Sequence, residues 1–115
     1  MDETLEKALE FANFSATLNN QKAILYNKYI DDCALYYQGC KFTVTMTLFS
    51  FVSNLVTQKI NKTVLIDDNT VPTTIENTEE FLDLLKEKYA FATNAYLESY
   101  KELTSKRSIE GLVDV

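Results

Sequence analysis

The sequence predicts an α+β fold that is mostly helical, with two long antiparallel helices, a middle helix and a small three-stranded antiparallel sheet. Three observations predict this class. The 115 residues include only two glycines and one proline, too few for the many turns of an all-β chain. Two long segments repeat apolar residues at helical spacing, and short β-branched runs lie between them. Because a chain of 115 residues is large enough for one core of its own, residues 1–115 are predicted to form a single domain.

Residues 2–37 contain no glycine or proline and predict one long helix. A helix of this length measures roughly 50 Å, which is longer than a compact monomer needs. We therefore expect an elongated molecule, a break at Asn19-Asn20, or a partner chain. Apolar and small residues in this segment follow the alternating four–three spacing of a heptad seam. The seam consists of Leu5, Leu9, Ala12, Ala16, Asn19, Ala23, Tyr26, Ile30, Cys33 and Tyr37.

A second apolar row on the same segment contains Phe11, Phe14, Leu18, Leu25 and Tyr29. It lies roughly 100–150° around the helix from the heptad seam. One neighbouring helix covers one seam, so two rows need two neighbours. Because tyrosine and phenylalanine are favoured at protein interfaces, this row is the candidate interface, and core packing is the competing interpretation.

The middle of the chain predicts one strand followed by one helix. Gly39 suits the left-handed position that ends a helix. Residues 40–45 alternate and are β-branched enough for a short strand. A middle helix should then run from Thr45 or Thr47, as N-cap, to Lys59.

Two β-branched runs within residues 63–76 predict a hairpin whose turn contains Asp67, Asp68 and Asn69. Aspartate and asparagine form turns because their side chains bond to nearby backbone. A calcium loop needs ligands at alternating positions and a glycine in mid-loop, and this turn has neither. We expect the strand at 40–45 to join the hairpin and complete the three-stranded sheet.

The last long helix is predicted to begin with Asn77 or Thr78 as N-cap. Residues 108–115 are predicted as a short tail. If the two long helices pack antiparallel through their matching seams, Tyr36 and Tyr37 should lie near the start of the last helix, close to Phe81. The heptad seam of this helix consists of Leu82, Leu85, Tyr89, Ala92, Tyr96, Ser99 and Leu103.

Charge excludes two classes of partner. The chain has 11 basic and 17 acidic residues, a net charge of −6, which disfavours direct binding to nucleic acid or to anionic membranes. No apolar run follows a basic start, so no signal peptide is predicted. The most apolar stretch, residues 44–60, is too short and too interrupted to span a bilayer. These features predict a cytoplasmic protein.

Residues that carry enzyme chemistry are scarce. The chain has no histidine, which removes the commonest general base and every Ser-His or Cys-His pairing. Cys33 and Cys40 are spaced by seven, which fits neither a redox pair nor a zinc site, so both are interpreted as structural thiols. We expect no enzyme activity, no catalytic or metal-binding residues and no cofactor.

Four stretches, DETLEKALEFANFSATLNNQK, QGCKFTVTMTLFSFV, IDDNTVPTTIENTEEFLD and YLESYKELTSKRSIEGLV, resemble a family of small proteins of T-even-type tailed phages, especially marine ones. That family often carries a Gly-Gly pair after the first helix, where this chain has Gly39-Cys40. The resemblance implies either a capsid-assembly role, similar to small prohead-core proteins, or an early role in host takeover. It transfers no functional residues.

The predicted function is that of a non-enzymatic phage protein that acts by protein–protein contact, as a small structural or capsid-assembly component. It would associate with itself through helical seams, in the host cytoplasm or the virion. The alternative is an acidic inhibitor or modulator of a host or phage enzyme, including a nucleic-acid mimic.

Overall fold

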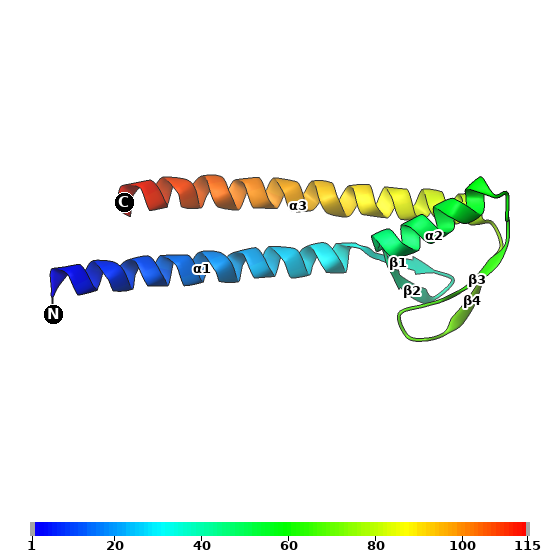
Figure 1. Cartoon of the computed structure of the whole chain (residues 1–115), viewed down its shortest axis with the longest axis horizontal. Coiled ribbons are helices and arrows are strands. Elements are labelled where there is room, and N and C mark those ends of the chain that lie inside the picture. The colour runs from blue at the N-terminus through cyan, green and yellow to red at the C-terminus, as the bar shows by residue number, and fades with distance from the viewer. Residues whose placement is uncertain (1, 115) are drawn as a thin grey trace. The chain divides into compact units, whose positions relative to one another are not determined.

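The computed structural model describes the backbone of residues 2–114 and the side chains of residues 2–106. Over this range the chain is mostly helical, with three helices and four short strands (Figure 1). In chain order they are α1 (Glu3–Asp32), β1 (Ala34–Tyr37), β2 (Cys40–Thr43), α2 (Met46–Thr57), β3 (Thr63–Ile66), β4 (Pro72–Ile75) and α3 (Thr78–Asp114).

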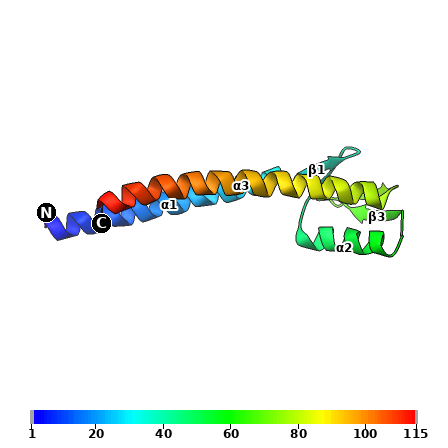
Figure 2. The same cartoon turned by 90° about the horizontal axis from the view of Figure 1, so that it is seen from above.

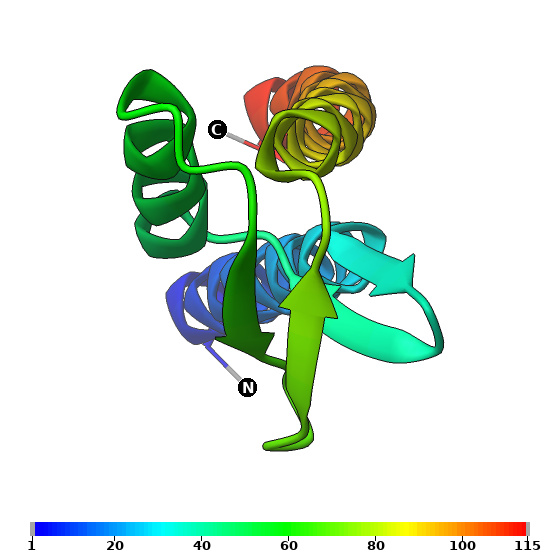
Figure 3. The ribbon, with the colours of Figure 1, turned by 90° about the vertical axis from the view of Figure 1, so that its right-hand side faces the viewer.

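The strands form two separate antiparallel hairpins, so the prediction of one three-stranded sheet is wrong. β1 pairs with β2, and β3 pairs with β4. Figure 3 shows the two pairs of strands as distinct sheets. The predicted strand at 40–45 is present as β2, but its partner is β1, the segment just before it in sequence. Because the two strands are joined by a turn of only two residues, little chain entropy is lost when they pair.

The first helix is shorter than predicted because its expected last turn is strand β1. The turn between β1 and β2 consists of Gln38 (φ 50°) and Gly39 (φ 78°). Two positive φ angles in succession are the signature of a type I′ hairpin turn. Gly39 therefore has the left-handed backbone predicted for it, but it closes a hairpin and does not cap a helix. The helix continues through Asn19-Asn20 without a break.

Helix α2 begins as predicted and ends at Thr57, two residues before the predicted Lys59. Thr45 is its N-cap, and the Thr45 hydroxyl accepts the Leu48 backbone N–H at 3.1 Å. At the other end Lys59 has φ 61°. The N–H of Lys59 donates to the Val56 carbonyl, and the N–H of Ile60 donates to the Leu55 carbonyl. This pair of bonds is a Schellman motif, with a lysine at the position that glycine usually occupies.

Helix α3 begins as predicted and continues further than predicted. Asn77 is its N-cap, because the Asn77 side chain accepts the Glu80 backbone N–H at 3.1 Å. The Thr78 hydroxyl donates to the Ile60 carbonyl at 2.6 Å, which joins the start of α3 to the end of α2. Figure 2 shows α2 alongside this first part of α3. Residues 108–114, predicted as a tail, are helical, while Val115 and the side chains from Arg107 onward lie outside the described residues.

The chain divides into two compact units. The helical unit comprises Met1–Lys28 and Ala95–Val115, and the core unit comprises Tyr29–Asn94. Among the described residues, every buried side chain belongs to the core unit. The single-domain interpretation of residues 1–115 stays a prediction.

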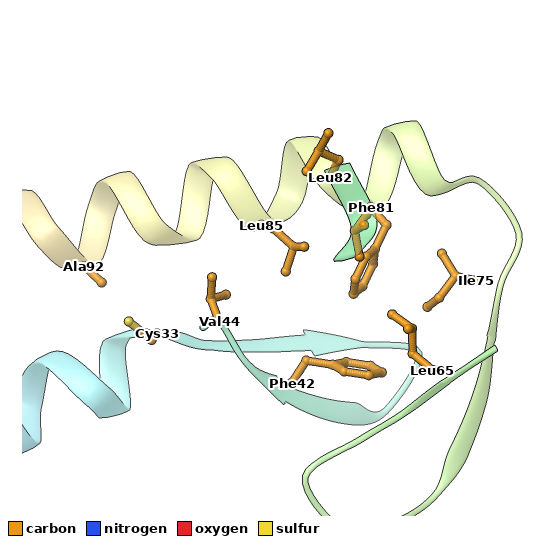
Figure 4. Close-up of a cluster of buried hydrophobic side chains, with 10 residues drawn as sticks. Cys33, Phe42, Val44, Leu65, Ile75, Phe81, Leu82, Leu85 and Ala92 are labelled. Atoms are coloured by element: carbon orange, nitrogen blue, oxygen red, sulfur yellow. The ribbon is translucent and has the colours of Figure 1, made fainter. Parts of the chain in front are cut away.

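The core unit is organised around Phe81 of α3, which is fully buried. Its ring meets Phe42 edge-on at 5.5 Å between centroids and Tyr37 at 5.2 Å. Of the two tyrosines predicted to lie close to Phe81, Tyr37 does so, although from a strand, whereas Tyr36 is 70% exposed. Each such aromatic pair contributes about 1 kcal/mol beyond its burial. Figure 4 shows most of the surrounding cluster, which consists of Cys33, Phe42, Val44, Val52, Leu65, Ile75, Phe81, Leu82, Leu85 and Ala92.

Candidate interaction surface

The helical unit is built from two antiparallel segments, residues 3–28 of α1 and residues 95–106 of α3 (Figure 1). Tyr26 meets Tyr96 edge-on at 6.3 Å between ring centroids. The Lys22 ammonium lies 5.6 Å from the centroid of the Tyr100 ring. Because residue numbers fall along α1 as they rise along α3, the two segments run in opposite directions.

No described side chain of the helical unit is buried. The whole of α1 lacks a buried residue, and residues 95–106 of α3 also have none. Two helices alone cannot enclose a core, because each can cover only the side of the other that faces it. The unit therefore leaves much of its apolar surface in contact with solvent.

The side of α1 that faces α3 is the second apolar row. Phe14, Leu18 and Leu25 are half-buried. Leu25 lines a shallow hollow together with Ser99 and Leu103 of α3. On α3 the half-buried residues of this unit include Tyr96, Ser99 and Leu103, which belong to the predicted seam of that helix.

The first six residues of the predicted heptad seam of α1 lie on its exposed side. Leu5 is 50% exposed and Leu9 48%. Ala12, Ala16, Asn19 and Ala23 are also exposed. At 100° per residue this row lies about 150° around the helix from the row that faces α3. Further along the seam, Tyr26 meets Tyr96 of α3 and Cys33 is buried. We call the six residues Leu5, Leu9, Ala12, Ala16, Asn19 and Ala23 the α1 seam.

The five residues of the candidate interface occupy different environments. Phe11 is 62% exposed, whereas Phe14, Leu18 and Leu25 face α3 within the helical unit. Tyr29 belongs to the core unit and packs against its core. As an interface to another protein, this row remains a prediction.

The sequence predicted that the matching heptad seams of the two long helices pack against each other, but Phe14, Leu18 and Leu25 of the second row are the residues half-buried in the helical unit. Side-chain size offered a signal for this. Phe14, Leu18 and Leu25 are large, while the α1 seam carries alanine at three of its positions. A pair of helices gains more from covering the larger side chains, since the free energy of burial scales with apolar area. The α1 seam consequently remains exposed to solvent.

The acidic stretch after β3 is a turn, as predicted. The Asp67 carboxylate accepts the backbone N–H of Asn69 at 2.9 Å and of Val71 at 2.7 Å. The Asp68 carboxylate accepts the hydroxyl of Thr43 at 2.5 Å. Both carboxylates are therefore engaged in bonds that shape the protein. Among the side chains that the structure describes, no three cysteine, aspartate or glutamate residues gather into a group that could hold a metal ion.

Both cysteines are free thiols. Cys33 adjoins Val44 at one end of the β1–β2 hairpin, and Cys40 pairs with Tyr37 at the other. Four residues of strand separate them by roughly 13 Å, which exceeds the limit of about 7 Å for a disulfide.

Cys33 also lies within a cluster of phenols. Burial raises the pKa of the Cys33 thiol, so the thiol keeps its proton and is a weak nucleophile. Burial, and then a hydrogen bond with Cys33, raises the pKa of Tyr29 to about 12. These groups are packed as neutral members of the core unit.

Comparison of the chain with protein-family models, with curated proteins and with solved structures finds no match. Within residues 2–114, none of the helices has both the length and the apolar character needed to cross a membrane.

Proposed function

We propose that this protein is a small, non-enzymatic assembly component that associates with itself through the α1 seam. The observation that carries the proposal is the solvent exposure of six consecutive positions of the heptad seam, from Leu5 to Ala23, on a helix whose other apolar row already faces α3. In the setting that the resemblance to phage proteins implies, the component would be similar to a prohead-core protein. The acidic-modulator alternative stays a prediction, because no feature of the described surface specifically favours it.

Heptad spacing favours a helix as the binding partner. Residues that alternate at three and four positions stay on one side of a helix and insert between the side chains of another helix. Leu5 and Leu9 each keep about half of their surface exposed. Covering the remaining area of such a leucine contributes about 1 kcal/mol. A second copy adds the same contribution from its own seam.

Sedimentation equilibrium of the purified full chain over a wide concentration range tests the proposal. The wild type should associate as its concentration rises. Ala16→Glu places a charge in the middle of the α1 seam and should leave the chain monomeric. Thr17→Glu is the matched control, because this exposed residue lies on a third side of α1, 100° from Ala16 and 100° from Leu18.

Phe11→Glu separates the α1 seam from the row first predicted as the interface. If the seam carries the contact, Phe11→Glu should associate like the wild type while Ala16→Glu does not. A wild type that stays monomeric at every concentration would contradict the proposed function. Association that Ala16→Glu leaves intact would place the contact elsewhere.

A further inference from the structure

The outer edge of strand β1 is open. Because a two-residue turn closes the β1–β2 hairpin, the facing residues Tyr36 and Lys41 point their backbone N–H and C=O groups away from the ladder. On the β2 side these outward groups are occupied, since the Asp68 N–H donates to the Lys41 carbonyl and the Asp68 carboxylate accepts the Thr43 N–H. On the β1 side, no described residue forms a hydrogen bond with the Tyr36 backbone. In Figure 3 the cyan strand β1 has β2 along one side and no strand along the other.

Tyr36 is the position at which a further strand can add. This residue is 70% exposed, whereas Ala34, whose backbone also points outward, is only 6% exposed. Proteins usually block an exposed strand edge with proline or charged side chains, and β1 has the sequence ALYY, which contains neither. An extended antiparallel segment lying along β1 would exchange two backbone hydrogen bonds with Tyr36.

A mainly apolar hollow lies on the β1 side of the hairpin. It is lined by Leu35 of β1 and by Leu84, Glu87, Lys88 and Phe91 of α3, and no described residue of β2 lines it. Phe91 is 58% exposed. The hollow measures about 270 Å³, less than the roughly 300–1,000 Å³ of a small-molecule site, so it suits one apolar side chain. The residue of an added strand that lies opposite Leu35 would point to the same side of the sheet, towards this hollow.

The border of the hollow on α3 is acidic. At 100° per residue, Glu80 and Glu87 lie within about 60° of Leu84 around the helix, and Asp83 lies about 100° away on the same flank. None of these three carboxylates forms an ion pair with a described residue. The Lys88 ammonium lies over the phenylalanine ring of the hollow, 5.5 Å from its centroid. Three negative charges against one positive charge favour a basic partner.

We propose that the β1 edge and the hollow together bind an extended, basic segment of another protein, which adds a strand to β1 beside Tyr36. An apolar side chain of the segment enters the hollow. Lysine or arginine two positions away lies on the same side of the added strand, towards the acidic border. A second copy of the chain fits less well, because it carries the same acidic border and a net charge of −6. This surface belongs to the core unit and is separate from the α1 seam.

A blocked heptapeptide, Thr-Lys-Thr-Leu-Thr-Lys-Thr, is a suitable probe. It places one leucine between two lysines on one side and β-branched threonines on the other. Fluorescence anisotropy of the labelled peptide, titrated with the full chain at low salt, should show saturable binding. The peptide with glutamate in place of both lysines should bind at least about tenfold more weakly, because its charge matches that of the border. Equal binding of the two peptides, or no binding at millimolar chain, would overturn the inference.

Two substitutions at Tyr36 test the strand addition. Tyr36→Pro removes the outward N–H, which the ladder does not use, and should weaken binding of the lysine peptide at least about tenfold. Tyr36→Ala keeps that N–H and should bind within about threefold of the wild type. Circular dichroism checks that both variants fold. Equal losses in the two variants would mean that the tyrosine side chain carries the contact, and wild-type binding by folded Tyr36→Pro would equally overturn the inference.

Phe91→Ala tests the hollow without changing the hairpin, so it decides the matter even if Tyr36→Pro does not fold. It should weaken binding of the lysine peptide about tenfold, because the apolar side chain loses its largest contact. Phe51→Ala is the matched control, since Phe51 is a similarly exposed phenylalanine (48%) on α2, and it should bind like the wild type. Unchanged binding by Phe91→Ala would overturn the inference.

Sedimentation separates this inference from the proposed function. A wild type that stays monomeric but binds the lysine peptide would contradict the proposed function alone. Self-association that Tyr36→Pro abolishes, without peptide binding by the wild type, would assign the β1 edge to a second copy and overturn the inference.

Discussion

The carboxylate of Asp68 accepts both the hydroxyl of Thr43, at 2.5 Å, and its backbone N–H, at 3.2 Å. The backbone N–H of Asp68 in turn donates to the carbonyl of Lys41 at 2.8 Å. These bonds attach the turn of the β3–β4 hairpin to strand β2. The two sheets of the core unit are thus linked through a turn, in place of the continuous ladder that a three-stranded sheet would have.

A double-mutant cycle with Thr43→Val and Asp68→Ala should give a coupling free energy of about 1 kcal/mol, because the pair is a charge-assisted hydrogen bond at the surface. Urea unfolding followed by circular dichroism measures it. The exposed ion pair of Lys62 and Glu76, 3.1 Å apart, is the control and should show less than about 0.5 kcal/mol. Equal couplings would mean that the Asp68 bond does not hold the hairpins together.

Asp67→Ala should lower the free energy of unfolding by about 2 kcal/mol, since it removes the acceptor for two backbone N–H groups next to a buried side chain. Asp67→Asn keeps an acceptor oxygen, so its free energy of unfolding should fall by less than that of Asp67→Ala. Asn69→Ala, which changes an exposed side chain in the same turn, should stay within about 0.5 kcal/mol of the wild type. Urea unfolding again supplies the values, and a large effect of Asn69→Ala would argue against the role given to Asp67.

Calcium or magnesium should leave the thermal unfolding midpoint unchanged. The Asp67 and Asp68 carboxylates accept protein hydrogen bonds, and a cation would have to displace them. Thermal melts with and without millimolar cation, recorded by circular dichroism, check this. A rise of several degrees would overturn the assignment of this segment as a structural turn.

Lys59→Gly should raise the free energy of unfolding by about 1 kcal/mol. Lys59 has a left-handed backbone at the end of α2, which costs an ordinary residue roughly 1–2 kcal/mol and glycine little. The neighbouring Gln58 has φ −82°, so Gln58→Gly should be destabilising by about 0.5–1 kcal/mol. Chemical denaturation should therefore show that the free energy of unfolding rises in Lys59→Gly and falls in Gln58→Gly.

Alkaline pH should destabilise the core unit through Tyr29. The pKa of Tyr29 rises from 10.0 to about 12 in the folded chain, so the unfolded chain loses this proton first. The stability linked to Tyr29 is full below pH 10 and is lost as the pH rises towards 12. The raised pKa of Cys33 acts in the same direction. Tyr29→Phe removes the ionisable phenol, and its unfolding free energy should fall less between pH 10 and 11.5 than that of the wild type.

The features predicted from sequence were those set by neighbouring residues. The N-cap at Thr45, the turn at Asp67 and the start of α3 at Asn77 depend on side chains that bond to backbone within a few positions. The seam of α3 was also identified correctly, since the spacing of its apolar residues marks only one side of that helix for burial. The long first helix was correct up to Asp32.

Contacts distant in sequence decided the remaining features. Residues 34–37 would suit either a helix or a strand, and pairing with residues 40–43 selects the strand. The choice between the two apolar rows of α1 likewise depended on which row α3 would cover. Local spacing shows that a helix has two apolar sides. Only packing against another segment determines which side is covered, because the free energy of burying a side depends on the partner surface that covers it.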